Sequence, residues 1–165
     1  MTISSVEKRT TGKSGAISTQ ILQNGKRIAF IQEGAEKVDL ERYWQAVLRQ
    51  DRETLRGFFH PDAWVNWHNT GERFTVEEFI RANCEYPGEW EGELERVEKT
   101  GSLIITAARV FSREQGLSFH VTSFLREREG KIAALDEYWG DDGPPPKWRQ
   151  EKKLGRPIPR EGAPG

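Results

Sequence analysis

Three or four long strand-like runs between residues 91 and 139 constrain the fold of this chain more than any other feature. The runs span roughly 91–99, 102–112, 117–127 and 131–139. The pairs that separate them are Thr100-Gly101, Gln115-Gly116 and Glu129-Gly130. Short connections that contain glycine are typical of tight turns between strands. Since short turns join only antiparallel neighbours, the runs predict an antiparallel meander.

Three helices are predicted before the meander. The first follows Asp39, a suitable N-cap, because five apolar residues recur there at helical spacing. These residues are Leu40, Tyr43, Trp44, Val47 and Leu48. The second helix is short and follows Asp51. A strand at 63–68 separates it from the third helix, which opens with the capping-box pattern between Thr75 and Glu78.

The N-terminal stretch differs in composition from the centre of the chain. Residues 1 to about 15 are small and polar, and we expect them to be disordered or to form an adaptable arm. Two strand-like runs then flank Asn24-Gly25, a pair that suits a two-residue hairpin turn. We therefore predict an arm at 1–37 that contains a hairpin and lies outside the main domain.

The C-terminal stretch is rich in proline. Six of the eight prolines follow Gly140, so no regular element is expected there. We expect part of this tail to lie over its own domain or a dimer partner through three apolar anchors, Trp148, Leu154 and Ile158. The predicted division is a main domain at 38–142 and a tail at 143–165.

Composition and charge exclude several classes of protein. The 165 residues suit one domain, and 25 basic against 26 acidic residues lack the basic excess of a nucleic-acid binder. No apolar run is long enough for a membrane helix, and the N-terminus lacks the apolar core of a secretory signal. The single cysteine, Cys84, suits a reducing compartment. We expect a cytoplasmic protein that binds neither nucleic acid nor membrane.

The order helix, helix, short strand, helix and curved meander resembles the nuclear transport factor 2-like superfamily, also called SnoaL-like or cystatin-like. Three stretches carry the resemblance: FFHPDAWVNWHN at 58–69, ERFTVEEFI at 72–80 and GKIAALDEYWGDD at 130–142. It implies an α+β cone in which three N-terminal helices pack on a strongly curved antiparallel sheet. In that superfamily one face of the sheet surrounds a pocket, and the other often forms a homodimer interface. Its members include ketosteroid isomerase, scytalone dehydratase, polyketide cyclases and limonene epoxide hydrolase, alongside many proteins with no known chemistry, so the fold leaves function open.

Turn positions predict which residues share a face of the meander. If the last turn is Glu129-Gly130, Thr122 pairs with Glu137; if the preceding turn is Gln115-Gly116, Arg109 pairs with His120. The face that we expect to line the pocket then carries Arg109, Phe111, His120, Thr122, Phe124, Leu135, Glu137 and Trp139. A bulge would shift the pairing by one residue and exchange the faces.

Ionisable residues among aromatic ones make this face the candidate site. Burial and opposite charges shift pKa values there and can create acid and base roles. We assign Glu137 as general base or acid, His120 as second proton carrier and Arg109 as the group that stabilises an oxyanion. The expected ligand-binding residues are Asn69, His68, Trp67, Phe111, Thr122, Phe124 and Trp139.

The resemblance to limonene epoxide hydrolases is partial. Residues 67–69 keep an asparagine of that family, residues 109–111 keep its arginine, and residues 137–139 keep a carboxylate. Phe111 replaces the second carboxylate, which is why His120 is the candidate for the second proton transfer.

Two functions are compatible with these residues. One is a cofactor-independent acid/base enzyme, an isomerase, dehydratase, cyclase or hydrolase, that acts on a small apolar organic molecule. The other is a non-catalytic binding or dimeric assembly module in which the same residues form a structural ion-pair network. No cofactor is expected, and the three histidines lack the spacing of metal ligands.

Overall fold

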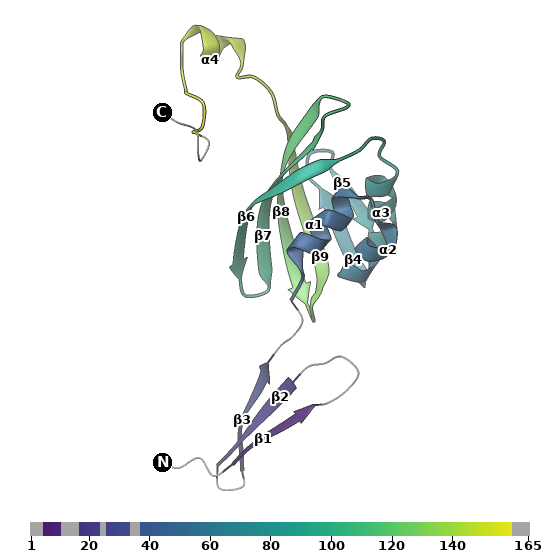
Figure 1. The fold of residues 1–165 in the computed structure, drawn as a ribbon, viewed down its shortest axis with the longest axis vertical. Helices are drawn as coiled ribbons and strands as arrows, with labels where there is room; N and C mark the ends of the chain where they lie inside the picture. The colour runs from purple at the N-terminus through teal and green to yellow at the C-terminus, as the bar shows by residue number, and fades with distance from the viewer. Residues whose placement is uncertain (1–4, 11–16, 24–25, 34–36, 160–165) are drawn as a thin grey trace.

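A six-stranded mixed sheet forms the centre of the fold, with strand order β5-β4-β9-β8-β7-β6 (Figure 1). The computed structural model describes residues 5–10, 17–23, 26–33 and 37–159. The strands are β4 (Phe59–Trp67), β5 (Glu72–Thr75), β6 (Glu91–Thr100), β7 (Leu103–Ser112), β8 (Leu117–Arg128) and β9 (Lys131–Asp141). The four long strands pair antiparallel as a meander, as predicted, and β4 joins β9 in parallel.

Three helices precede or interrupt the sheet where the capping residues predict them. They are α1 (Leu40–Leu48), α2 (Arg52–Phe58) and α3 (Val76–Cys84). Asp39 accepts a hydrogen bond from the backbone N–H of Arg42 at 3.1 Å, and Asp51 caps α2 in the same way. Thr75 and Glu78 form the reciprocal capping box at the start of α3. Each cap satisfies backbone donors that the first turn of a helix leaves free.

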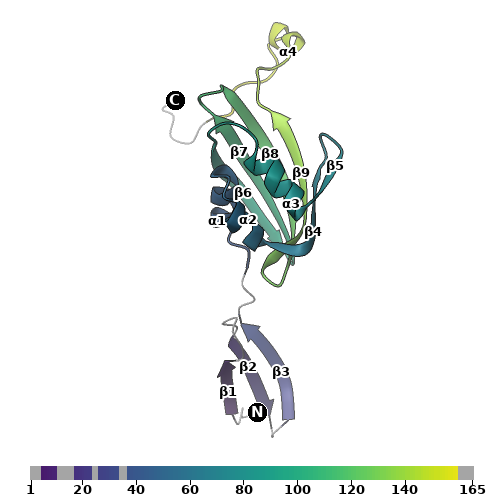
Figure 2. The same cartoon turned by 90° about the vertical axis from the view of Figure 1, so that its right-hand side faces the viewer.

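The helices cover one face of the sheet (Figure 2), called the inner face below. Alternate strand residues point to it and pack against the apolar stripes of the helices. Ile104, Val121, Leu125 and Leu135 are fully or almost fully buried there. The architecture is the predicted α+β cone with an unclosed, curved sheet, and the core lies between the helices and the inner face.

A second sheet, of three antiparallel strands, precedes the helices in the sequence. Its strands are β1 (Ser5–Thr10), β2 (Ile17–Gln23) and β3 (Lys26–Glu33). The predicted hairpin is confirmed, since Gln23 pairs with Lys26; the turn residues themselves lie outside the described residues. Of the two possibilities for the first 15 residues, disorder is wrong for β1, because pairing with β2 supplies backbone hydrogen bonds that a polar composition does not exclude. The other possibility, an adaptable arm, stays a prediction.

The C-terminal segment contains more regular structure than its prolines suggest. Strand β9 continues to Asp141, and a short helix, α4 (Lys147–Glu151), begins directly after Pro146. Proline is tolerated at a helix start because its missing N–H would be unpaired there anyway. Trp148 is 56% exposed and Ile158 is 89% exposed, so these side chains do not pack on the chain's own domain. Contact with a dimer partner stays a prediction.

Candidate functional site

The register of β8 with β9 separates the residues that the turn positions had placed together. Between β7 and β8 the predicted pairing is confirmed, with Arg109 opposite His120. Between β8 and β9 the pairing shifts at Arg126/Glu127, so Glu137 lies opposite Ser123 and not Thr122. A shift of one residue moves a side chain to the other face of the sheet. The prediction that Glu137 shares a face with Arg109 and His120 is therefore wrong.

Arg109 and His120 belong to a polar cluster on the outer face, the face away from the helices. His120 Nδ1 lies 2.5 Å from Asp142 Oδ1, Ser118 Oγ donates to Asp142 Oδ2 at 2.5 Å, and Arg109 Nε donates to Ser118 Oγ at 3.1 Å. Glu95 is 3.4 Å from the other ring nitrogen of His120. The hydrogen bond to Asp142 raises the pKa of His120, although partial burial opposes this shift.

Asp142 holds this outer cluster together. Partial burial raises the pKa of Asp142, but the hydrogen bonds from Ser118 and His120 outweigh it, and the net pKa lies below the usual value. Within the described part of the chain, the cluster is internally paired and lies away from the inner face, which agrees with a structural ion-pair network.

Four further residues predicted to bind a ligand also lie on the outer face. His68 stacks on Tyr138, with ring centroids 4.3 Å apart, and its Nε2 lies 2.8 Å from Asp136. The Arg109 guanidinium lies 4.9 Å from the centre of the Phe111 ring. Thr122 and Phe124 pair with Tyr138 and Asp136 on this same face. None of the four lines the inner-face cavity. Phe111, Thr122 and Phe124 alternate along β7 and β8 with the buried Val110, Val121 and Leu125, so they point to the opposite face.

Glu137 points to the inner face and is almost completely buried, with 2% of its surface exposed. Its Oε2 accepts hydrogen bonds from the indole N–H groups of Trp67 at 2.9 Å and Trp139 at 3.1 Å. Its Oε1 accepts from Ser123 Oγ at 3.1 Å. Burial raises the pKa of Glu137, and the three hydrogen bonds oppose this because they favour the ionised form.

Tyr43 on α1 brings a second titratable group close to Glu137. Its ring is fully buried, and its hydroxyl has no hydrogen-bond partner among the described residues. Burial raises the pKa of Tyr43 well above its ordinary value, and the negative charge of Glu137 adds to the shift. Thr106 Oγ1 is likewise buried without a partner. These hydroxyls, with the Glu137 carboxyl, give the apolar core a small polar interior.

A cavity of about 470 Å³ opens on the inner face. Trp67, Asn69 and Trp139, all predicted ligand-binding residues, line it. The remaining lining residues are Val47, Leu48, Gln50, Thr70, Ala82, Asn83, Tyr86, Trp90, Val110, Phe119, Gly140 and Asp141. Glu137 lies beneath this wall, since both indoles that hold its carboxylate also line the cavity.

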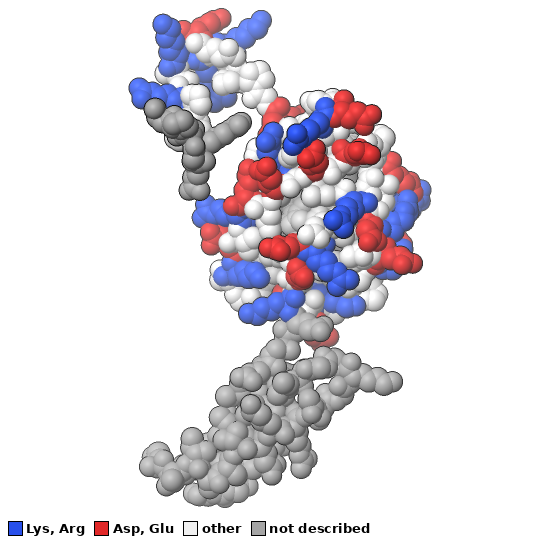
Figure 3. Space-filling model, viewed as in Figure 1, with Lys and Arg blue, Asp and Glu red and all other residues white. Residues whose placement is uncertain are grey.

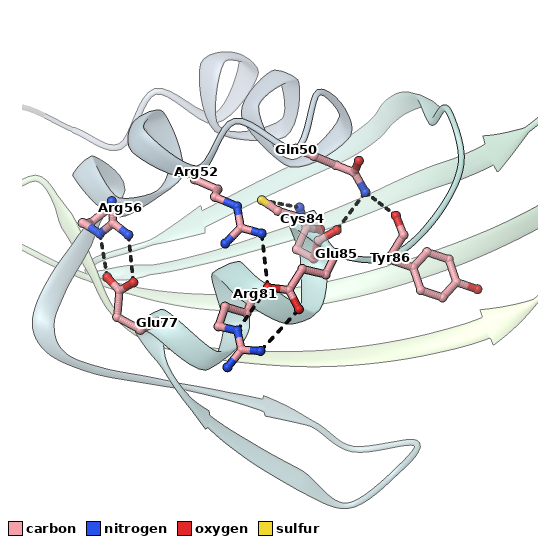
Figure 4. Close-up of polar contacts among 9 residues, drawn as sticks. Gln50, Arg52, Arg56, Glu77, Arg81, Cys84, Glu85 and Tyr86 are labelled. Carbon is pink, nitrogen blue, oxygen red and sulfur yellow. Dashed lines mark hydrogen bonds and ion pairs between the residues drawn. The ribbon is translucent and has the colours of Figure 1, made fainter.

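Side-chain amides fix the edges of the cavity. Gln50 Nε2, in the turn after α1, donates to the backbone carbonyls of Asn83 and Tyr86 at 2.9 Å and 2.6 Å (Figure 4). Asn83 Nδ2 donates back to the carbonyl of Val47 at 3.0 Å. These bonds tie the end of α1 to the end of α3. Asn69 acts similarly on the other side, since its amide both donates to and accepts from the backbone of Trp139.

Ion pairs on the outside of the helices support the same arrangement. Arg56 on α2 makes a two-pronged contact with Glu77 on α3, and Arg52 reaches Glu85 (Figure 4). These side chains are about half exposed, so each pair adds little to stability. Their effect is to keep α2 beside α3, which carries the cavity residues Ala82 and Asn83.

Burial of Glu137 predicts a particular pH dependence of stability. Since its pKa is higher in the folded chain than in the unfolded chain, its contribution is complete below the pKa of an exposed glutamate and is lost as pH rises through the raised value. Wild type should therefore lose stability relative to Glu137→Gln across that window, by up to about 1.4 kcal/mol per pH unit between the two pKa values. Urea unfolding of both proteins from about pH 4 to pH 9 measures the difference. A difference that stays constant or favours wild type as pH rises would contradict the prediction.

Three further observations concern metal binding, surface charge and membrane insertion. In the described part of the chain, no three side chains of His, Cys, Asp or Glu come together as metal ligands. On the face of the domain that Figure 3 shows, Lys and Arg lie among Asp and Glu without an extended area of one sign. None of the described helices has the length and apolar character required to cross a membrane.

Sequence reasoning missed several cavity residues. Phe119 is not among the residues predicted to line the pocket, although it alternates with the buried Val121 and Leu125, a pattern that marks the inner face of β8. Tyr86 and Trp90 lie in the irregular segment between α3 and β6, where no periodicity indicates which side chains turn inward.

Comparisons with known proteins agree with this architecture. Among solved structures, a Kribbella flavida protein provisionally called a ketosteroid isomerase is 21% identical, with a TM-score of 0.61 over 74% of this chain and 88% of its own. An NTF-2 like protein of unknown function from Burkholderia xenovorans is 24% identical, with a TM-score of 0.60 over 73% of this chain and 92% of its own. An LEH-like epoxide hydrolase from M. tuberculosis is 15% identical, with a TM-score of 0.52 over 61% and 79%.

At these identities the solved structures establish the fold alone. No curated protein sequence matches at a significant level. The family model described as SnoaL-like domain matches residues 40–135, which include α1 to α3 and most of the six-stranded sheet. The chain therefore belongs to the SnoaL-like domain family, within the NTF2-like fold.

Proposed function

We propose that this protein binds a small, largely apolar organic molecule in the cavity on the inner face of its sheet. The observation that carries the proposal is the cavity itself, whose volume of about 470 Å³ lies in the range of ligand pockets and whose walls are mainly aromatic and aliphatic. No side chain of the described residues fills the cavity. Trp148 and Ile158 in the C-terminal segment are exposed, so they do not cover it. These features favour ligand binding over a purely structural module.

Glu137 supports a second candidate function, proton transfer to or from the bound molecule. It is a carboxyl with a raised pKa, directly behind two walls of the cavity, and a raised pKa suits a general acid or base near neutral pH. Arg109 and His120 are not part of this proposal, because they alternate with the buried Ala108 and Val121 and so lie on the outer face. Turnover of a substrate that survives Glu137→Gln would show that Glu137 is not the proton carrier.

A cavity-filling variant tests the binding proposal. Ala82 on α3 lines the cavity, so Ala82→Phe should occupy the space and lower affinity for the neutral apolar dye N-phenyl-1-naphthylamine by at least about tenfold. The measurement is energy transfer from the cavity tryptophans to the dye. Arg81→Phe is the matched control, because it adds the same ring one position away on the exposed side of α3. Equal affinity in both variants, or no dye binding by wild type, would overturn the proposal.

Homodimerisation and a cytoplasmic location stay predictions. The outer face offers partly buried Phe124 beside Tyr138, which is 47% exposed, and such a face suits contact with a second copy. Sedimentation velocity would decide the question, and a strictly monomeric protein at high concentration would contradict the dimer.

A further inference from the structure

The polar atoms of the cavity are unevenly distributed between donors and acceptors. The indole N–H groups of Trp67 and Trp139 both donate to Glu137 and so are not available to a ligand. Gln50 and Asn83 direct their amide N–H groups to backbone carbonyls, which leaves their side-chain oxygens as acceptors. A ligand that needs hydrogen-bond donors from the protein therefore finds few of them here.

Aromatic rings form one continuous wall. Tyr86 lies against Trp90 with ring centroids 5.3 Å apart, Trp90 against Phe119 at 6.0 Å, and Phe119 against Trp139 at 6.4 Å. The Nε1 atom of Trp90 is buried and has no hydrogen-bond partner among the described residues, so the accessible part of this side chain is the carbon atoms of its ring. Aromatic faces carry negative electrostatic potential and attract cations within about 6 Å of the ring centre.

A carboxylate stands at the end of this wall. Asp141 lines the cavity, and its register opposite Phe119 places it on the inner face with Trp139. Asp141 is an exposed residue at the end of β9 and takes part in none of the ion pairs found among the described residues, and no Lys, Arg or His lines the cavity. The neighbouring Asp142 differs in its face and in its partners, because it points outward and is paired with His120 and Ser118.

From these contacts we infer that the ligand is an organic cation, a quaternary or tertiary ammonium group carried on an apolar body. The ammonium group lies against the Trp90 and Phe119 rings with Asp141 as counter-charge, and the apolar body extends along the aliphatic wall at Val47 and Leu48. A quaternary ammonium has no N–H to satisfy, so it suits a cavity with π-faces and one carboxylate. This inference rests on the proposed function, since it names the ligand class of the same cavity.

Two probes of nearly the same shape separate charge from size. Benzyltrimethylammonium and neopentylbenzene differ mainly in that a quaternary nitrogen replaces a quaternary carbon. Wild type should bind the cation more tightly than the hydrocarbon by on the order of tenfold, measured by quenching of tryptophan fluorescence. Asp141→Asn should remove most of that preference, whereas Asp142→Asn, the same change one residue later, should keep it. Thermal unfolding of each variant confirms that the protein measured is folded.

The outcomes distinguish this inference from the proposed function. Equal or tighter binding of neopentylbenzene by wild type would overturn the cation inference and leave the apolar cavity proposal standing. A preference that Asp141→Asn retains, or that Asp142→Asn loses equally, would also overturn it, because Asp141 would not be the counter-charge. Failure of both probes to bind would count against the proposed function as well.

Discussion

Glu137→Leu is expected to lower the free energy of unfolding by about 3 kcal/mol relative to Glu137→Gln. Leucine removes the acceptor of the Trp67 and Trp139 indole N–H groups, and both donors then stay buried without a partner. Each unpaired buried donor costs about 1–3 kcal/mol. Glutamine keeps a carbonyl oxygen for both indoles, and its amide can donate to Ser123 Oγ, which replaces the present bond in the reverse direction.

Urea unfolding at neutral pH measures this difference between the two variants. Glutamine also removes the buried negative charge, so Glu137→Gln should be at least as stable as wild type above the raised pKa of the carboxyl. If Glu137→Leu proves as stable as Glu137→Gln, the two indoles do not depend on this acceptor. Glu137 would then not be the polar centre of the inner face.

The helices and the meander could be predicted because their signals are local. Asp39, Asp51 and the pair Thr75 and Glu78 act within one turn of their own helix, and the structure confirms all three caps. Glycine-containing turns specify neighbouring antiparallel strands in the same way. The β7–β8 register follows its turn without interruption, which is why Arg109 lies opposite His120 as predicted.

The β8–β9 register could not be predicted from its turn because a bulge lies close to that turn. Arg128 pairs with Lys131 as expected, and the shift follows at Arg126/Glu127. No single residue type marks such a bulge. Without a bulge, however, the apolar alternation in β8 and the pairing counted from the turn contradict each other. The apolar alternation in β8 places Val121 inward, whereas the turn count would then place Glu137 and Trp139 outward. In the structure, Val121, Glu137 and Trp139 all face the helices, and the bulge makes this possible because it adds one residue to one strand of the pair.

Burial of neighbouring residues indicates the site residues better than their chemical type does. A catalytic role is predicted for Arg109 and His120 because they are ionisable groups near aromatic residues. Their neighbours Ala108 and Val121 are almost completely buried, which assigns the inner face to the alternate set. Asp141 carries no periodic signal, and its place in the cavity depends on where β9 ends.

Ile104→Ala is expected to destabilise the protein by about 2–5 kcal/mol, and Ile105→Ala by at most about half of that. The two residues are adjacent in β7 and identical in type, so the comparison isolates the face on which each one lies. Ile104 is 2% exposed and belongs to the core, whereas Ile105 lies on the outer face, opposite Phe124, and is only partly buried. The turn-based assignment would reverse the order, because Ile105 alternates with Arg109.

Urea unfolding at low protein concentration gives both values and limits any contribution from self-association. Equal costs would mean that both faces of β7 are buried to a similar extent. A larger cost for Ile105→Ala would return Arg109 and His120 to the inner face. The cavity, the buried Glu137 and the separation of Asp141 from Asp142 all depend on the order stated here, since one pattern of alternation along β7, β8 and β9 determines them together.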